Sequence, residues 1–454
     1  MNDYNINLRN HQYNKAIKNI EHNKLLNHNR NKLIYNFELG RLHYLNNNPK
    51  ESNQYFNLAD DQLEANYKTV KDVVLSNLLN PMMEIYRGEE FEKFMLNYYK
   101  SMNYISLGQP DEAVVEARKI TLASDRLSEK NKNPNKYNKD PFAFNLQGMI
   151  YEMSGDMNNA FISYRNAANT YIDAGGVYYG TSTPDQLKID LLKSASAMGF
   201  TDEQEKYEQL FNQKLQNNKS EYGELILFCE EGNAPVKTEI SFTIVNTGNG
   251  NAFQYVDQYG SYVSFPFVYS NYGINNNQLS DIKTFRVAMP QYSIVTKNQI
   301  SKSVNVNGES QVPQLAQDFN TLAVSVLNER FLTELAKTAA RFIVKRATEK
   351  GSGKLAENIA NSNSKSNETE EEKKKREDRA EAVGNVVSFL VNITNSVTEK
   401  ADTRCWISLP AYISYMRIPL KEGENTIEIN ANGKKQTLKI NSQKGIQMKS
   451  VLLD

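Results

Sequence analysis

The stretch FNLQGMIYEMSGDMNNAFISYRNAA, residues 144–168, predicts two antiparallel helices joined by a tight turn. Gly148 and Ala160 are small residues at positions where two helices can approach closely, and Tyr164 falls where it can fill the seam between them. Gly155 lies between the two apolar runs and is expected to end the first helix. This segment therefore predicts a compact helix-turn-helix unit.

A similar spacing of small and aromatic residues recurs at two earlier places. The first consists of Gly40, Ser52, Phe56 and Ala59. The second consists of Ser101, Tyr104, Gly108, Ala113 and Ala117. This spacing is typical of the tetratricopeptide repeat, a helix-turn-helix unit of about 34 residues. The repeats are not evenly spaced, so extra helices must lie between them. We expect residues 1–220 to form an irregular tetratricopeptide-like α-solenoid, a fold that usually binds other proteins.

From residue 222 onward the chain has short runs of β-branched and aromatic residues bounded by Gly, Asn and Pro. Gly423 and the pair Asn432-Gly433 are natural turn formers between the last runs. We expect residues 222–454 to form an antiparallel β-sandwich. The predicted strands are Glu224–Glu230, Thr238–Val245, Tyr262–Tyr269, Ile282–Ala288, Tyr292–Lys297, Arg404–Leu409, Tyr412–Pro419, Asn425–Ile429 and Gln436–Ile440.

A helical insertion, residues 311–400, is expected to interrupt this β domain. Apolar residues at helical spacing run from Leu315 to Phe342 and again from Val383 to Val397, and the polar stretch between them includes the charge run Glu370–Arg376. Two amphipathic helices joined by a solvated linker are implied. They are expected to pack on each other or on the sandwich, with contact at a membrane surface as the alternative. The fold class is thus α+β and multidomain.

The composition argues against a nucleic-acid partner. Lys+Arg and Asp+Glu both number 53 among 454 residues, giving a formal net charge of +0. No run of about 18 apolar residues occurs, which argues against an ordinary membrane-spanning helix. The opening residues also lack the basic and apolar regions of a signal peptide.

Few residues suited to catalysis or metal binding are present. The histidines all lie in the first tenth of the chain, so the β half cannot form a Ser-His-Asp or Cys-His site by itself; they are His11, His22, His28 and His43. We expect exposed polar histidines rather than a metal site, and no catalytic or cofactor-binding residue. Cys229 and Cys405 are either two buried free thiols or one disulfide. The pair Glu230-Glu231 is expected in a turn after the first strand.

Two groups of residues are candidates for recognition. On the concave surface of the solenoid, the candidate partner contacts are Tyr98, Tyr99, Asn103, Asn145 and Arg165. In the second half, Asp402, Arg404 and Trp406 form a dense cluster of distinctive residue types. We expect Arg404 to pair with Asp402 and Trp406 to fill the sandwich core. The alternative is an aromatic and guanidinium patch that recognises a glycan or a peptide.

Several motifs resemble a poorly characterised family of bacterial cell-envelope lipoproteins. They are Tyr35–Leu42 with Ser52 and Phe56, Tyr86-Arg87-Gly88, Ala113–Arg118, Gly223–Ile226 with Pro235-Val236-Lys237, and Ala401–Trp406 with Leu409-Pro410. The resemblance spans nearly the whole chain. Members of that family are exported and anchored by a lipidated cysteine, but no cysteine precedes Cys229 here. The resemblance thus implies that an export signal and a lipid-bearing cysteine have been removed from this sequence.

The expected function is a non-enzymatic protein-protein interaction scaffold of the cell envelope. It would be periplasmic or associated with the outer membrane, with a cytoplasmic location as the alternative. Its partners would be envelope proteins rather than nucleic acid or small molecules, and the resemblance brings no catalytic residue and no cofactor. The alternative function is binding of a glycan or peptidoglycan by tyrosines of the β half, namely Tyr255, Tyr259 and Tyr262.

Overall fold

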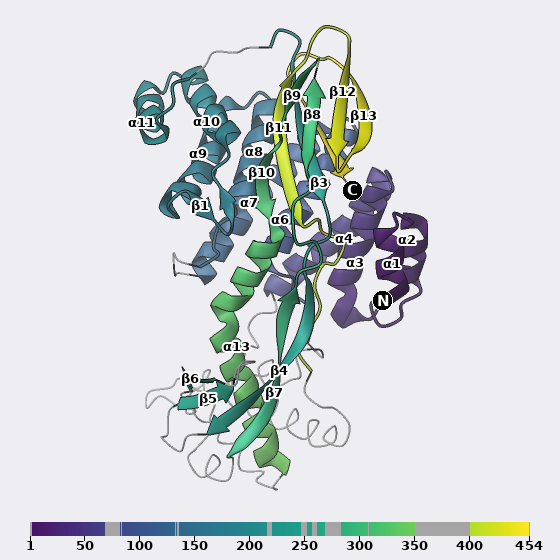
Figure 1. Ribbon diagram of the computed structural model, residues 1–454, viewed down its shortest axis with the longest axis vertical. Helices are drawn as coiled ribbons and strands as arrows, with labels where there is room; N and C mark the ends of the chain where they lie inside the picture. The colour runs from purple at the N-terminus through teal and green to yellow at the C-terminus, as the bar shows by residue number, and fades with distance from the viewer. Residues whose placement is uncertain are drawn as a thin grey trace, which may run out of the picture.

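A computed structural model gives the architecture of the chain (Figure 1). It describes residues 2–68, 82, 84–131, 133, 136–215, 220–246, 252–256, 261–267, 283–306, 308–349 and 400–453. The fold is mixed α+β, with helices in the first half and several small sheets in the second, as expected. None of these sheets closes into a barrel.

Consecutive helices of the first half pack in pairs, α3 with α4, α6 with α7 and α8 with α9, and successive pairs contact one another. The helices of this half are α1 Asn2–Arg9, α2 Tyr13–Glu21, the short 3-10 helix η1 Asn29–Asn31, α3 Lys32–Leu45, α4 Pro49–Lys68, α6 Glu90–Ser106, α7 Pro110–Lys130, α8 Pro141–Met153, α9 Met157–Asp173, α10 Asp185–Ala197 and α11 Thr201–Phe211. A short hairpin follows α9. Its strands, β1 Val177–Tyr178 and β2 Thr181–Ser182, have two residues each.

Small residues let the paired helices touch, as the sequence predicted. A Cβ atom added to Gly148 in α8 would lie 2.5 Å from ring atoms of Tyr164 in α9, and one added to Gly40 in α3 would overlap the ring of Phe56 in α4. Gly155, with φ of 85°, follows α8, and the next residue, Asp156, caps α9. The predicted turn and seam are therefore confirmed.

Substitution of Gly40 tests this seam. We expect Gly40→Ala to lower the free energy of unfolding by about 1–3 kcal/mol, because the added methyl group overpacks the α3–α4 contact. In a Phe56→Leu background the same change should cost clearly less, since the smaller side chain leaves room. Denaturant unfolding of the four proteins measures the coupling, and equal costs in both backgrounds would contradict the proposed steric origin.

The described residues of the second half form three four-stranded sheets, with orders β10-β11-β3-β14, β13-β12-β8-β9 and β6-β5-β4-β7. Most neighbours are antiparallel, but β14 lies parallel to β3, which the sequence did not predict. The strands are β3 Glu224–Glu231, β4 Val236–Asn246, β5 Ala252–Val256, β6 Tyr262–Pro266, β7 Thr284–Ser293, β8 Lys302–Val306, β9 Glu309–Gln311, β10 Gln314–Asp318, β11 Tyr412–Pro419, β12 Glu424–Ala431, β13 Lys434–Asn441 and β14 Ile446–Leu453.

The sheet that contains β3 is buried on both faces. Because side chains alternate along a strand, Ile226 and Phe228 pack on the helices, whereas Leu225 and Leu227 pack on the sheet that contains β12. Ile427 and Ile429 of β12 belong to this second apolar cluster. The first sheet therefore lies between the helices and the second sheet.

The third sheet forms an arm with α13, Phe319–Glu349, which runs away from the main body beside β4 and β7 in Figure 1. Phenylalanines of the sheet, such as Phe242 and Phe285, pack against Leu335, Ala339 and Ile343 of the helix. The predicted start of the helical insertion is wrong, because Gln314–Asp318 form the strand β10 and the helix begins at Phe319. The second predicted stripe and the charge run lie outside the described residues.

Some strand predictions are wrong. Residues 404–409 form no strand, and β7 ends at Ser293, so most of the predicted strand 292–297 is irregular. The turn at Asn432-Gly433 is confirmed, with φ of 48° and 80°, as a two-residue hairpin requires. Among the described helices, none is both long and apolar enough to cross a membrane.

Candidate functional site

Residues 400–411, here called the strap, are mostly buried and form a turn at residues 407–408 instead of the predicted strand. Side chains supply the hydrogen bonds that a sheet would have given. The backbone N–H of Trp406 donates to the Glu92 carboxylate at 2.7 Å, and the backbone N–H of Ile407 donates to the Glu38 carboxylate at 2.7 Å. Buried backbone groups need such partners, so two carboxylates from α3 and α6 fix the course of the strap.

Trp406 lies in a different core from the one predicted. It is 1% exposed and stacks on Phe37 of α3, with ring centroids 4.4 Å apart, while Phe56 and Tyr99 present their edges to it. Its indole N–H donates to the Ser408 hydroxyl at 3.0 Å. Trp406 therefore fills the helical core and not the space between the sheets, because the strap lies on the helix side.

The predicted pair between Arg404 and Asp402 is confirmed. The guanidinium makes two bonds to the carboxylate, of 2.8 and 2.7 Å, and also donates to the Asn31 side chain at 2.9 Å. The Tyr86 ring lies over it. Because Arg404 and Trp406 are both buried, these residues fasten the strap to the helices and present no open recognition patch.

A buried ion pair joins α3 to β3. Arg41 donates to the Glu230 carboxylate at 2.5 Å and to the Ser408 carbonyl at 3.2 Å. Tyr98 and Tyr99 of α6 also donate to Glu230, at 3.1 and 3.4 Å. This cluster connects two helices, the strap and the central sheet.

Four of the five candidate partner contacts are buried by the chain itself, although one of them, Asn103, borders an open pocket. Tyr98, Tyr99, Asn103 and Asn145 are each at most 2% exposed. The reason is that the sheet containing β3 and β14 packs on this side of the helices. Arg165 is half-buried and lies over the Phe161 ring. Sequence periodicity identified the inner face but not its occupant.

Glu230 and Glu231 are adjacent in sequence but form ion pairs with different layers of the structure. Both lie in β3 and not in a turn, which corrects the prediction for this pair. Their side chains point to opposite faces, so Glu230 meets Arg41 on the helix side while Glu231 meets Lys302 of β8 at 2.6 Å on the other. The two carboxylates therefore bind this sheet to α3 on one face and to β8 on the other.

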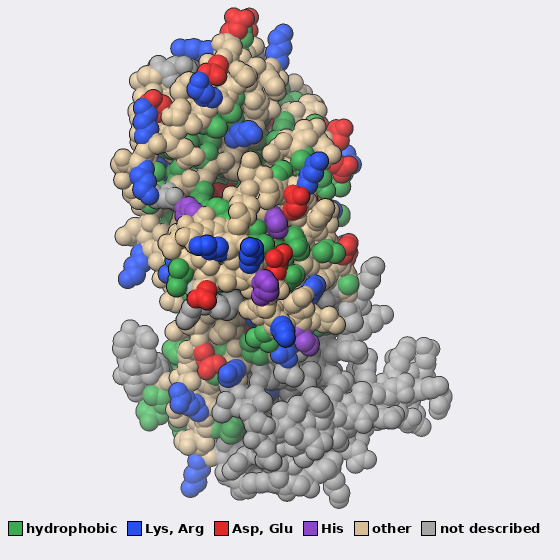
Figure 2. Space-filling view, turned by 90° about the vertical axis from the view of Figure 1, so that its right-hand side faces the viewer, with side chains coloured by type: hydrophobic (Ala, Val, Ile, Leu, Met, Phe, Trp, Pro, Cys, Tyr) green, Lys and Arg blue, Asp and Glu red, His purple; other side chains and the backbone are tan. Residues whose placement is uncertain are grey.

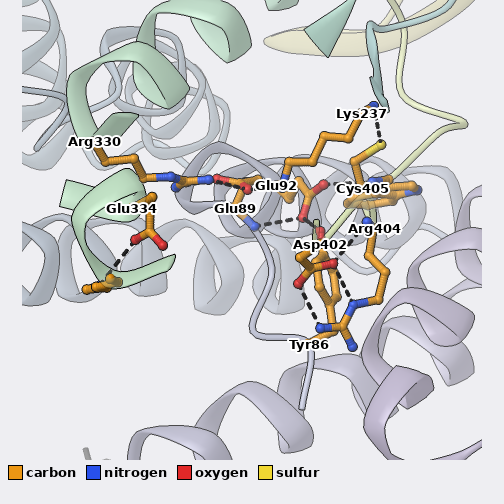
Figure 3. A network of polar contacts seen from close by, with 11 residues as sticks. Tyr86, Glu89, Glu92, Lys237, Arg330, Glu334, Asp402, Arg404 and Cys405 are labelled. Atoms are coloured by element: carbon orange, nitrogen blue, oxygen red, sulfur yellow. Dashed lines mark hydrogen bonds and ion pairs between the residues drawn. The ribbon is translucent and has the colours of Figure 1, made fainter. Parts of the chain in front are cut away.

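A second ion cluster lies where α6, β4 and the arm helix α13 meet (Figure 3). Glu89 accepts two bonds from Arg330 of α13, of 2.8 and 2.7 Å, and one from Lys237 of β4. Burial alone would raise the pKa of Glu89, but the two cations outweigh it and hold that pKa well below its usual range. Glu89 thus connects the arm helix and β4 to the start of α6, and Glu329 of α13 adds a second link by accepting from the Tyr137 N–H at 3.1 Å.

Removal of this charge should be costly. We expect Glu89→Gln to lower the free energy of unfolding by about 3–5 kcal/mol, because the buried Lys237 loses its counter-ion. Glu334→Gln is the matched control, since its pair with Lys337 is about one-third exposed, and it should change stability by less than about 0.5 kcal/mol. Denaturant midpoints compare the two, and equal losses would contradict the assignment.

Glu92 lies beside Glu89 and is also buried. Its carboxylate accepts from the Tyr86 hydroxyl at 2.6 Å and from the Glu89 N–H at 2.8 Å, in addition to the strap. Burial, and then the Glu89 charge, raises the pKa of Glu92 to about 7. The group therefore changes its charge near neutral pH while holding the start of α6 and the strap.

The raised pKa makes stability depend on pH. The contribution of Glu92 is fully present below its ordinary pKa and is lost as pH rises toward about 7. Relative to Glu92→Gln, the wild-type free energy of unfolding should fall by up to about 3 kcal/mol between about pH 4.5 and pH 7.5. Denaturant unfolding of both proteins across this range measures the difference, and a flat difference would contradict the assignment.

A third cluster surrounds Arg417 of β11. Its guanidinium contacts Asp190 of α10 at 3.0 Å, Glu152 of α8 at 2.5 Å and Glu224 of β3 at 3.0 Å. Burial raises the pKa of Asp190 to about 6 despite this cation. Arg417 was not predicted as a site residue, because nothing in its local sequence pattern indicates partners more than 190 residues away.

Cys229 and Cys405 are free and buried, so the disulfide alternative is not the one found. Burial raises the pKa of each thiol to about 12, which makes both poor nucleophiles at neutral pH. Within the described residues, no group of three or more His, Cys, Asp or Glu side chains is placed to hold a metal ion.

The surface on the side of the N-terminal helices is of mixed charge. Figure 2 shows Lys and Arg side chains interspersed with Asp and Glu on this face, and its histidines stand apart from one another. His11, His22 and His28 are exposed, as expected, whereas His43 is half-buried and stacks on Tyr55. This charge pattern agrees with the balanced composition.

The tyrosines proposed for glycan binding do not form one aromatic platform among the described residues. Tyr262 is 65% exposed on β6, whereas Tyr255 packs on Phe242 and Phe331 inside the arm. Tyr259 lies outside the described residues. The structure therefore supplies one exposed ring for this alternative.

An open pocket lies beside the Arg41–Glu230 pair. It has a volume of about 230 Å³ and is bounded by the end of α3, the end of α6 and strand β14. Asn103 is the one candidate partner contact that lines it. The pocket is where the inner face of the helices still meets solvent beside the sheet.

No family model, curated protein or solved structure matches this chain. Its function must therefore be argued from its own geometry.

Proposed function

We propose that this chain is a non-enzymatic scaffold that binds a partner protein at the bacterial cell envelope. The observation that carries the proposal is the pocket between α3, α6 and β14, which leaves part of the helical inner face open. Much of the remaining face packs on the chain's own sheet, and a second pocket, of about 400 Å³, lies farther along between α10 and the start of β3. Partner binding is accordingly assigned to the pocket beside β14 and its rim.

Helix packing supports a tetratricopeptide-like solenoid as the scaffold. The glycine–aromatic contact recurs in two helix pairs, at Gly40 with Phe56 and at Gly148 with Tyr164. In the second half, the two sheets that share the cluster of Leu225, Ile418 and Ile427 form the proposed β-sandwich. Ion clusters between these parts make a rigid platform, which suits a protein that positions others.

The proposed location rests on the family resemblance of the motifs. A periplasmic or outer-membrane-associated protein with a lipid anchor attached upstream would present this platform to envelope partners. The buried, unreactive thiols and the lack of a metal-binding cluster among the described residues are compatible with a role in binding.

Site-specific crosslinking tests the proposal. A photoreactive residue at Ser106, on the pocket rim, should capture one envelope protein in the native host, whereas the same residue at the exposed Lys435 of β13 should not. Mass spectrometry identifies the product. Capture of cytosolic proteins alone would refute the location, and equal capture from both positions would refute the surface.

A further inference from the structure

The pocket beside β14 has features that point to a particular kind of ligand. Strand β14 is the last strand of its sheet, and among the described residues its ladder partner is β3 alone. Its residues 448–452 form one wall of the pocket. An edge strand offers unpaired N–H and C=O groups, to which an extended peptide can add as a further strand.

The charge of the pocket favours an anionic group. Two cations, Arg41 and Lys449, and one carboxylate, Glu230, line it. Arg41 is 1% exposed, and its Nη1 atom has no hydrogen-bond acceptor among the described residues, although Nη2 and Nε are both paired. The guanidinium lies over the rings of Tyr44 and Tyr99, and a ligand oxygen that reached Nη1 would give this buried atom an acceptor.

The size of the pocket limits the ligand. A volume of about 230 Å³ is below the range of about 300–1,000 Å³ that holds drug-sized molecules, and it suits a single residue. Met102 and Met448 give the wall an apolar part for a side chain. Tyr44 and Ser450 are hydrogen-bonded to each other and connect α3 to β14 here.

We propose that this pocket receives the C-terminal residue of a partner polypeptide. Arg41 and Lys449 bind the terminal carboxylate, and the preceding residues pair with the open edge of β14. This inference rests on the scaffold function and specifies how that scaffold recognises its partner. Lys449 acts from an exposed position, whereas Arg41 is already oriented by Glu230 and the strap.

The test uses the full chain and a randomised eight-residue peptide library, offered once with free C-terminal carboxylates and once amidated. Affinity selection should enrich peptides from the free-carboxylate library only, and amidation of an enriched peptide should weaken its binding about tenfold or more. Failure of the free-carboxylate library to yield peptides, or equal binding of the amidated form, would overturn the proposal.

Variants locate the site. Lys449→Ala should weaken the enriched peptide about fivefold to tenfold, because a charge-assisted bond is lost, whereas Lys435→Ala on β13 should leave binding unchanged. Lys449 is exposed, so Lys449→Ala should fold even if a substitution of the buried Arg41, such as Arg41→Met, prevents folding. Equal binding by Lys449→Ala and wild type would place the site elsewhere.

The two proposals can fail separately. Suppose that the photoreactive residue at Ser106 captures an envelope protein and still captures it after residues are added to that protein's C-terminus. The scaffold function then stands, and the carboxylate inference is wrong. If free-carboxylate peptides bind at β14 but the native host yields only cytosolic partners, the pocket chemistry stands and the envelope location is wrong.

Discussion

The strap, residues 400–411, has buried polar groups, and the helices and sheets that pack on it supply their hydrogen-bond partners. The helices supply the acceptors, with Glu38 of α3 and Glu92 of α6 binding consecutive strap amides. Arg41 of α3 donates to the strap at Ser408 and to β3 at Glu230. Removal of one of these partner side chains would leave a buried group unpaired, at a cost of about 1–3 kcal/mol.

The same constraint determines which surface remains for a partner. The central sheet is apolar on both faces and is held between the helices and the second sheet, with Glu230 and Glu231 paired in opposite directions. The inner face of the helices is therefore largely an intramolecular interface. One place that stays open is the pocket at the edge strand β14, whose lining includes Arg41, with a guanidinium nitrogen that has no acceptor among the described residues.

Features that depend on local spacing were predictable. The glycine–aromatic seam at Gly148 and Tyr164, the hairpin turn at Asn432-Gly433 and the pair of Asp402 with Arg404 all involve residues no more than 16 positions apart. The partner contacts were misjudged because amphipathic periodicity shows that a face is apolar or aromatic but not what covers it. The strap was mistaken for a strand because its residue types favour β structure, whereas carboxylates over 300 residues away bind its amides.

The sequence by itself determined the division into a helical first half and a strand-rich second half, the close approach of the helix pairs and the balance of charge. These follow from periodicity, small residues and composition, which act over short distances along the chain. Only the tertiary structure decided that Trp406 belongs to the helical core, that β14 joins β3 in parallel and that Arg41 meets Glu230. Such pairings join segments about 190 to 370 residues apart, and they form because buried charges and amides must find partners wherever the fold brings them together.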